Sequence, residues 1–489
     1  MRIMSINDLN NDKTNDLVTV DDTGANVTVY YFDETTSTYS KSASFAMPTG
    51  YLVDNVLPTN MPMPLQNLII TATKKGSSGA DTTKMFYFKQ SETTATDPSG
   101  AYTWIETPND LNNVALYPNS QPMALDINGD QAMDLLYQTA SSGIKVALGS
   151  KSSVDTFTET DFFANYVVSS SANSDCKDPN TSDLISLPNS NAFVDFTGDC
   201  LPDLMLTRQT GSPADMQDGS KTVNTYYEIY SQVIVGGKSQ YCLAAQNGQL
   251  VDPKDTLGGR TGSATMPFIE IADFNRDGMF DLAFVSESGV LNVLFNKYQA
   301  PGPKAENLCN DINSTADLKT KPIFPTFPFT DGNGVVQETL GTWPDKNIVY
   351  RGIAASMPRS GQPGVPGRLR VADLDNDGNA DFVMTLSFQN RTDSTTFTRT
   401  VILLNVDGQE GQERSFSQVK SSDGSYLAKV IQVAGDSAEL LTFIDINENG
   451  KIDIIVQKEV NKVPQLIFLY NNIVTDNFFV KALSVNTAL

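Results

Sequence analysis

Six short segments of this chain carry acidic side chains at the spacing of a cation-binding loop. Each reads Asp-x-(Asp/Asn/Thr)-x-(Asp/Asn)-x-x-x-Asp, and an apolar run follows each one. Positions one, three, five and nine can turn side-chain oxygens inward, and position seven can offer its backbone carbonyl. Carboxylates packed this closely repel one another unless a cation lies among them. The pattern therefore predicts calcium, a hard cation that takes about six to eight oxygen ligands.

The predicted calcium ligands share these loop positions in all six segments. In chain order they are Asp8, Asn10, Asp12, Asp16; Asp126, Asn128, Asp130, Asp134; Asp195, Thr197, Asp199, Asp203; Asp273, Asn275, Asp277, Asp281; Asp373, Asp375, Asp377, Asp381; and Asp445, Asn447, Asn449, Asp453. The loops at Asp273 and Asp373 are the most complete, with Gly at position six to permit a sharp turn. The loops at Asp8 and Asp126 follow, then those at Asp195 and Asp445, and we expect affinity to fall in that order, with about four to six bound ions.

The loop pattern has two other interpretations. An EF-hand is excluded, because its Glu at position twelve is replaced by apolar residues such as Phe284, Met384 and Val456. The loops could instead be Asx-rich turns whose carboxylates cap backbone amides without a metal. If calcium does bind, protein atoms close each site, which disfavours catalysis at the metal.

The loops recur along the chain as part of one repeated unit. A further unit that has lost its chelator lies between the first two loops, where Asn67 marks the loop end and Thr59, Met61 and Met63 occupy ligand positions. Each unit contains short runs rich in Val, Ile, Phe and Tyr that read as four strands. Seven such units predict an all-β fold, a seven-bladed β-propeller of four-stranded blades. The expected blades are approximately 1–50, 51–120, 121–187, 188–265, 266–366, 367–436 and 437–489.

Strand signals dominate throughout, and we expect no amphipathic helix. Blades one and seven should close the ring by packing against each other. Propellers commonly bind partners through long loops at one rim, so the insertions at 207–225 and 297–366 are the expected places for a partner.

Composition and charge disfavour several classes of catalytic site and of binding partner. The chain has no His, which removes the usual general base of hydrolases and most zinc sites. Its formal net charge of -23 disfavours nucleic acid and anionic membrane surfaces as partners. No apolar stretch is long enough to span a bilayer, so this segment should not insert directly into a membrane.

The four cysteines (Cys176, Cys200, Cys242, Cys309) permit two disulfides in three connectivities, or they could be free buried thiols. Their clustering in the sequence favours pairing.

The repeated acidic loop between two strands resembles the FG-GAP repeat of integrin α-chain heads. It is more similar to the T-cell immunomodulatory protein family of integrin-α FG-GAP repeat-containing proteins. The stretches 190–206 and 443–481 carry this resemblance. It implies an extracellular or cell-surface glycoprotein whose propeller lies outside the cell. The chain shows no signal peptide at its start, so this localisation follows from the resemblance alone.

Three classes of function are compatible with the sequence. The first is a calcium-stabilised, non-catalytic propeller that binds a protein partner in adhesion or assembly. The second is a carbohydrate-binding propeller, which would need Trp or Tyr at one place per blade, a period that the sequence does not show. The third is a hydrolase or lyase with its site in the central channel. Against the third stand the missing His and the absence of any acidic or basic cluster outside the calcium loops. We expect the first.

Overall fold

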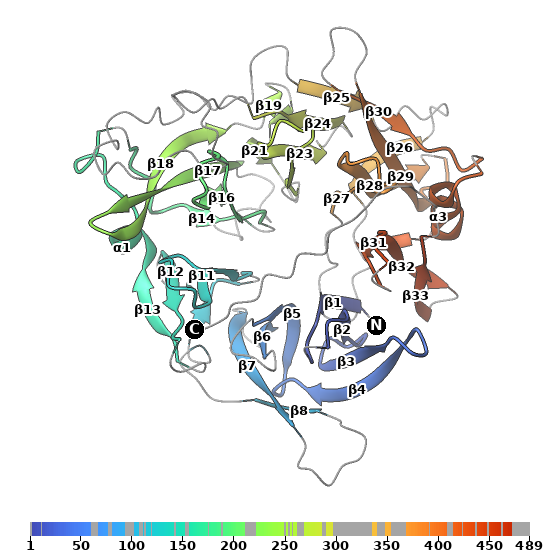
Figure 1. The fold of residues 1–489 in the computed structure, drawn as a ribbon, viewed down its shortest axis with the longest axis horizontal. Helices are drawn as coiled ribbons and strands as arrows, with labels where there is room; N and C mark the ends of the chain where they lie inside the picture. Colours follow the sequence, from blue (N-terminus) through green and yellow to red (C-terminus); the bar gives the residue numbers. More distant parts are fainter. Residues whose placement is uncertain are drawn as a thin grey trace.

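The chain folds into seven β-sheets arranged as blades around a ring, as the computed structural model shows (Figure 1). The prediction of a seven-bladed β-propeller of four-stranded blades is confirmed. The structure describes residues 2–471 with these gaps: 11, 60–66, 77–80, 93–101, 107–110, 112–113, 119, 141–142, 152–155, 175, 187–188, 211–221, 249–250, 253–254, 257, 262–267, 286–289, 297–334, 340–347, 354–367, 391, 408–413, 423, 436–437, 447–448 and 461–462.

Neighbouring strands in each blade are antiparallel and follow chain order. Blade one contains β1 (Arg2–Asn7), β2 (Asp16–Val20), β3 (Asn26–Asp33) and β4 (Thr38–Ala46). Blade two contains β5 (Tyr51–Pro58), β6 (Leu68–Lys74), β7 (Thr82–Glu92) and β8 (Tyr102–Glu106), with β9 (Ala115–Leu116) against β7. Blade three contains β10 (Met123–Leu125), β11 (Asp134–Gln138), β12 (Ile144–Leu148) and β13 (Thr158–Asp161).

Blades four and six carry additional short strands, and blade five has four strands. In blade four, β14 (Leu184–Ile185) and β15 (Ala192–Val194) pair with β16 (Asp203–Gln209), followed by β17 (Thr222–Val235) and β18 (Lys238–Gly248), with β21 (Gly258–Thr261) against β17. A separate hairpin contains β19 (Val251–Asp252) and β20 (Asp255–Thr256). Blade five contains β22 (Glu270–Ala272), β23 (Asp281–Val285), β24 (Val290–Leu294) and β25 (Val335–Thr339).

The last two blades complete the ring. In blade six, β26 (Ile348–Ile353) and β27 (Arg370–Ala372) both pair with β28 (Asp381–Asn390), followed by β29 (Thr396–Asp407) and β30 (Arg414–Gln418). The described strands of blade seven are β31 (Ala438–Ile444), β32 (Asp453–Val460) and β33 (Val463–Leu469). The strand expected at 478–483 lies outside the described residues.

The second strand of each blade is buried on both faces, which explains its continuous apolar sequence. In β11, Leu135 packs into the core shared with blade two, whereas the next residue, Leu136, packs into the core shared with blade four. Alternate side chains point to opposite faces of a strand, so each second strand supplies two cores. Seven such clusters lie between successive blades.

Blade seven packs against blade one, as expected. Phe32 of blade one shares a buried cluster with Ile446 and Ile455 of blade seven. The rings of Tyr39 and Phe468 stack across the same seam at 5.4 Å. In Figure 1, β31–β33 accordingly lie beside β1–β4.

The expectation that the chain has no amphipathic helix was wrong. Helix α3 (Tyr426–Ala434) begins at Ser425, whose Oγ accepts from Ala428 N at 3.2 Å, and ends at Gly435 with a φ of +59°. One face, including Leu427 and Val430, is buried in the core between blades six and seven. This short helix is stabilised mainly by that packing, which strand-dominated surroundings conceal in the sequence. A shorter helix, α1 (Phe162–Tyr166), precedes blade four.

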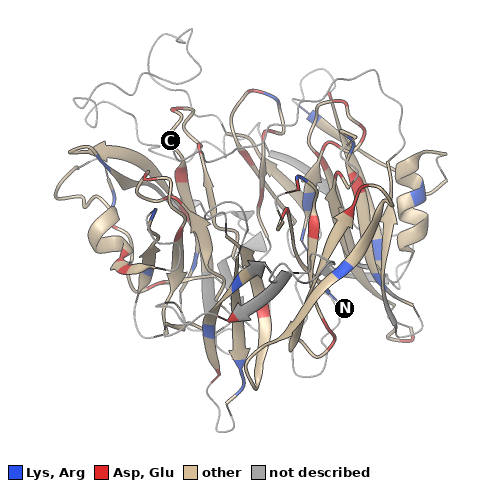
Figure 2. Cartoon of the chain, turned by 60° about the horizontal axis from the view of Figure 1, so that its bottom comes forward, with Lys and Arg blue, Asp and Glu red and all other residues tan. Residues whose placement is uncertain are grey.

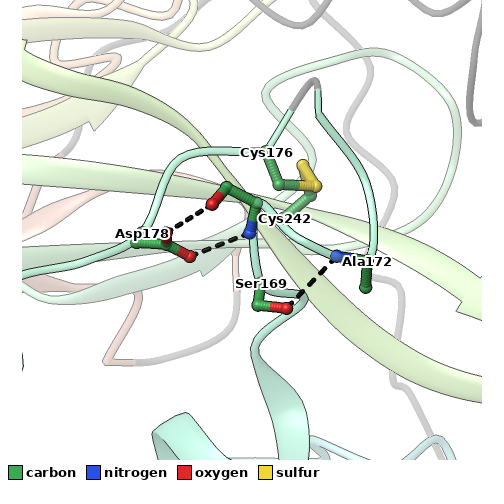
Figure 3. Close-up of a disulfide and its surroundings, with 6 residues drawn as sticks. Ser169, Ala172, Cys176, Asp178 and Cys242 are labelled. Carbon is green, nitrogen blue, oxygen red and sulfur yellow. Dashed lines mark hydrogen bonds between the residues drawn. A yellow bond between two sulfur atoms is a disulfide. The ribbon is translucent and has the colours of Figure 1, made fainter.

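A disulfide joins Cys176 to Cys242 of β18, with their Cα atoms 5.1 Å apart (Figure 3). It fixes the segment after α1 along β18, where Val168 N donates to Tyr241 O and Lys177 N donates to Leu243 O. Cys200 is also disulfide-bonded. Pairing is therefore the correct alternative for these three cysteines, and Cys309 lies outside the described residues.

The two insertions expected to meet a partner are only partly described. Residues 211–221 and most of 297–366 lie outside the described residues. Within the second insertion, β25 completes blade five and β26 pairs with β28 of blade six. That segment is therefore not wholly irregular, because parts of it supply blade strands.

Candidate calcium sites

Each of the six acidic loops joins an inner strand of its blade to the buried second strand, and all six coil around their first Asp. In the loop of blade six, Asp373 Oδ1 accepts from Asp377 N at 3.0 Å, and its Oδ2 accepts from Gly378 N at 2.9 Å. The equivalent pair of hydrogen bonds forms at Asp8, Asp126, Asp195, Asp273 and Asp445. Position one therefore organises the turn whether or not a cation is bound.

Position six lies in the left-handed region in all six loops, as the sharp turn requires. The residues there, with φ between 63° and 86°, are Lys13, Gln131, Cys200, Gly278, Gly378 and Gly450. Glycine adopts this conformation at no steric cost, whereas the other three residues hold it against their Cβ atoms. The loop geometry is thus maintained even where the sequence lacks Gly.

The Asp at position nine ties the loop to the rest of its blade. In blade six, Asp381 Oδ2 accepts from Leu374 N at 2.8 Å and its Oδ1 accepts from Asn405 N at 2.8 Å. The first donor is position two of the loop and the second belongs to the third strand, β29. All six of these Asp side chains are fully buried: Asp16, Asp134, Asp203, Asp281, Asp381 and Asp453.

Burial dominates the electrostatics of position nine. Desolvation raises the pKa of Asp16, Asp134, Asp281 and Asp381 to about 7, although backbone hydrogen bonds oppose the shift. Carboxylates at other loop positions raise these pKa values further. Without a cation, the folded loop disfavours the charge that position nine carries at neutral pH. A divalent cation would supply the missing countercharge.

Blade two retains this connection without the charge. Asn67 stands at position nine, and its Oδ1 accepts from Gln90 N of the third strand at 3.0 Å. Thr59, at position one, accepts from Asn67 N through Oγ1. The structural role of position nine therefore survives in a loop whose other ligand positions, Met61 and Met63, lie outside the described residues.

The Asp373 loop is where the described residues best fit a metal ion. One carboxylate oxygen from each of Asp373, Asp375 and Asp377 lies within 4.8 Å of the others. Asp375 Oδ1 is buried and has no hydrogen-bond partner. Burial, with like charge from Asp377, raises the pKa of Asp373 and Asp375. An orphaned carboxylate oxygen in a trio of acids fits a hard cation such as calcium.

Three other loops satisfy their acids internally. The Asn at position three donates to the Asp at position five at 2.8–3.1 Å in the pairs Asn10–Asp12, Asn128–Asp130 and Asn275–Asp277. The Oδ1 of each of these Asn residues also accepts from the backbone N of position five. These contacts are those of the Asx-rich turn considered above, so calcium at these loops stays a prediction.

The remaining two loops share with the other four the hydrogen bond from position seven N to the side chain at position five. In blade four, Thr197 Oγ1 donates to Asp195 at 3.3 Å, and Asp199 accepts from Leu201 N. In blade seven, Asn449 accepts from Lys451 N at 2.9 Å. Asn447 lies outside the described residues. The predicted ranking of affinities is untested.

The sequence interpretation missed the residues at the end of the third strands. Asn296 and Asn405 each donate a backbone N–H to the position-nine Asp of their own blade. Their side chains donate to Phe196 O and Phe274 O, the position-two carbonyls of the preceding blades. A recurring signal was present, because Leu-x-Asn stands near the end of three of these strands, at 294–296, 403–405 and 469–471.

A buried ion pair lies outside the acidic loops. In blade four, Arg208 Nη1 lies 3.0 Å from Glu228 Oε2, and both side chains are completely buried. Tyr230 Oη also donates to Glu228. Burial raises the pKa of Glu228 above its ordinary value, although the charge of Arg208 opposes this shift. Because the pair is sealed from solvent, it provides no open catalytic site. Figure 2 shows Asp and Glu residues spread over blades around the ring.

The fold and its loops define a seven-bladed propeller with an acidic loop in six of its blades. No protein-family model matches the chain. It is 24% identical over 318 residues to the T-cell immunomodulatory protein homolog of Plasmodium yoelii yoelii, covering 62% of this chain and 40% of that protein. It is 23% identical over 414 residues to the homolog of that name from Plasmodium falciparum, covering 78% of this chain and 49% of that protein.

These relatives confirm the resemblance to the T-cell immunomodulatory protein family. The chain spans less than half the length of either curated relative. Among solved structures, a Photorhabdus luminescens Tc holotoxin pore aligns at a TM-score of 0.27 and 12% identity, covering 91% of this chain and 16% of that one. At that score the alignment adds nothing to the description of the fold.

Within the described part of the chain, no helix has the length and apolar character needed to cross a membrane.

Proposed function

We propose that this chain is a calcium-stabilised, non-catalytic propeller that presents a binding surface to a protein partner outside the cell. The observation that carries the calcium proposal is the Asp373 loop, where Asp375 has a buried carboxylate oxygen without a partner and is clustered with two further acids. The same turn recurs in five other blades. A site at the same position in six blades is suited to stabilising the whole ring, whereas a catalytic site would be expected at one place.

Calcium bound in these loops would neutralise the acids and cross-link each turn to its blade. Asp373, Asp375 and Asp377 would hold the ion through side-chain oxygens. Asp381 would hold the loop against β29 through its two backbone hydrogen bonds. For a dissociation constant near ~10 μM in ~1 mM calcium, each occupied site would add about 2.7 kcal/mol to the free energy of unfolding.

The proposal of an extracellular protein partner rests on the relatives' names and on the architecture. T-cell immunomodulatory protein homologs are named for an effect on other cells, which a secreted or surface-exposed protein can exert. Disulfides at Cys176, Cys242 and Cys200 fit an oxidising compartment. A glycan remains the alternative partner.

The first experiment is thermal unfolding in calcium and in excess EGTA, together with a metal count on purified protein. We expect about four to six calcium ions per chain and a melting temperature that falls by several degrees or more on chelation. A chain with no bound calcium and an unchanged melting temperature would reduce the loops to Asx turns. The proposed calcium dependence would then be abandoned.

A further inference from the structure

Arg414, the first residue of β30, touches two acidic loops at once. Its Nη1 donates to Asn379 Oδ1 at 3.0 Å, in the loop of its own blade six. Its Nη2 donates to Asn275 O at 3.2 Å, in the loop of blade five. Arg414 is only 5% exposed. A guanidinium can make this double contact because its donors form a rigid planar fork.

Asn405 of β29 makes a second connection between the same loops. Its Nδ2 donates to Phe274 O at 2.9 Å in blade five and to Ala380 O at 3.2 Å in blade six. Its backbone N donates to Asp381 Oδ1 at 2.8 Å. Asn405 is fully buried, so these hydrogen bonds are shielded from competing water.

The atoms that Arg414 contacts are not those that a cation would use. At Asn275 it holds the backbone carbonyl, whereas the predicted ligand is the side-chain oxygen. At Asn379, which occupies position seven, it holds the side chain, whereas the predicted ligand is the backbone carbonyl. Arg414 thus positions ligand residues in both loops without occupying their ligand atoms.

We propose that the cation sites at the Asp273 and Asp373 loops are energetically coupled through Arg414 and Asn405, so that filling one raises the affinity of the other. This inference rests on the proposed function, since it requires cations in both loops. A bound cation restricts its own loop, and the shared hydrogen bonds transmit that restriction to the neighbour. The second ion then meets a loop that is already ordered.

The test reads the blade-five site alone. Phe280, at position eight of that loop, is 37% exposed, so Phe280→Trp places a fluorophore beside the site without disturbing the core. Terbium serves as the calcium probe, and its tryptophan-sensitised emission reports binding. The parent protein, which contains Trp104 and Trp343, gives the background. Disabling blade six with Asp375→Asn and Asp377→Asn should weaken terbium binding in blade five by about fivefold or more.

Arg414→Met should remove most of this dependence on blade six. Folding should survive, because the ion-pair partner of Arg414, Asp407, has a side chain that is 92% exposed and is left in solvent. Arg414→Lys is the matched variant. It keeps the charge, but its single ammonium cannot reach both acceptors, so coupling should also fall. Comparing the two variants separates the hydrogen bonds from the simple effect of charge.

The control at a distance removes the cation site of blade one with Asp8→Asn and Asp12→Asn. The terbium affinity of the blade-five loop should not change. Equal blade-five affinity with blade six intact or disabled would overturn the coupling. Coupling that persists in Arg414→Met would overturn the role assigned to Arg414. A complete lack of sensitised emission above background would overturn the cation site in blade five, and with it the proposed function at that loop.

Discussion

The position-nine Asp combines a structural role with a predicted ligand role at a single residue. Its two oxygens accept backbone N–H groups from the loop and from the third strand. Blade two shows that an amide can replace the carboxylate in the second of these contacts, since Asn67 accepts from Gln90 N. Substitutions at Asp381 can therefore separate the two roles.

Asp381→Ala should lower the free energy of unfolding in EGTA by about 2–4 kcal/mol, because it leaves two buried N–H groups without acceptors. Asp381→Asn retains one acceptor oxygen, so its loss in EGTA should be smaller, about 1–2 kcal/mol. The measurement is urea unfolding with and without calcium. Equal losses for both variants in EGTA would contradict the structural role of the hydrogen bonds. Asn67→Asp is the matched control and should produce no calcium dependence.

Asp54 of β5 gives a pH prediction at a residue outside the acidic loops. Burial raises its pKa to about 6 from the usual 3.8, despite a hydrogen bond from Thr73 and the nearby charge of Arg2. A folded-state pKa above the unfolded value means that the stabilising effect is complete below pH ~4 and is lost as the pH rises through about 6.

Asp54→Asn should therefore leave stability nearly unchanged at pH ~4 and increase it by about 1–3 kcal/mol at pH ~8. The measurement is the difference in urea unfolding between Asp54→Asn and the parent protein at both pH values, in EGTA. A difference that does not vary with pH would show that Asp54 keeps its ordinary pKa in the folded protein.

At the scale of elements, β18 differs from the other outer strands described because a disulfide fixes a segment along it. Ser170 N and Ser170 Oγ both donate to Asp178, and Ala172 N donates to Ser169 Oγ, so the segment is also ordered internally (Figure 3). Covering an outer strand hides donors and acceptors that could otherwise pair with another chain.

Replacing both Cys176 and Cys242 with Ala should cost about 2–4 kcal/mol, because a 66-residue separation is no longer closed in the unfolded chain. The amides of Val168 and Lys177, which donate to β18, should lose hydrogen-exchange protection first. Urea unfolding and hydrogen exchange measure the two effects. Unchanged protection at these amides would show that backbone pairing alone holds the segment.

For the whole molecule, the seam between blades seven and one is where the ring closes, and its cluster of described buried residues is small. Among the described residues, this cluster contains the buried Phe32, Ile446 and Ile455 with seven partly buried apolar residues packed against it, whereas the cluster between blades one and two contains thirteen buried residues. Asn15 Nδ2 also donates to Asp445 O across the seam at 3.3 Å. From the small number of buried apolar residues described at this seam, we expect the ring to open here first.

Ile446→Ala should cost about 2–4 kcal/mol and selectively expose β1 and β31 to hydrogen exchange. Ile127→Ala is the matched control, since Ile127 occupies the same loop position in blade three and is equally buried. It should lower stability without selective exposure at the seam. Similar exchange patterns in both variants would show that the ring unfolds as one cooperative unit.

The sequence by itself determined the repeat, the all-β class and the place of every acidic loop, because these are local patterns. Alternating burial and loop spacing are properties of a few consecutive residues. The sequence missed α3, whose apolar face becomes meaningful only against blades six and seven. It also left open the pairing of the cysteines, which depends on how a distant segment meets β18.

Only the tertiary structure decided which groups meet across neighbouring strands and across blades. The buried Arg208–Glu228 pair joins residues on neighbouring strands, and Arg414 links two loops whose residues lie more than a hundred positions apart in the chain. Local patterns cannot show such contacts, because they depend on strand register and on which blades become neighbours. The acidic spacing predicted a cation in each loop, but only the folded ring connected those loops to one another.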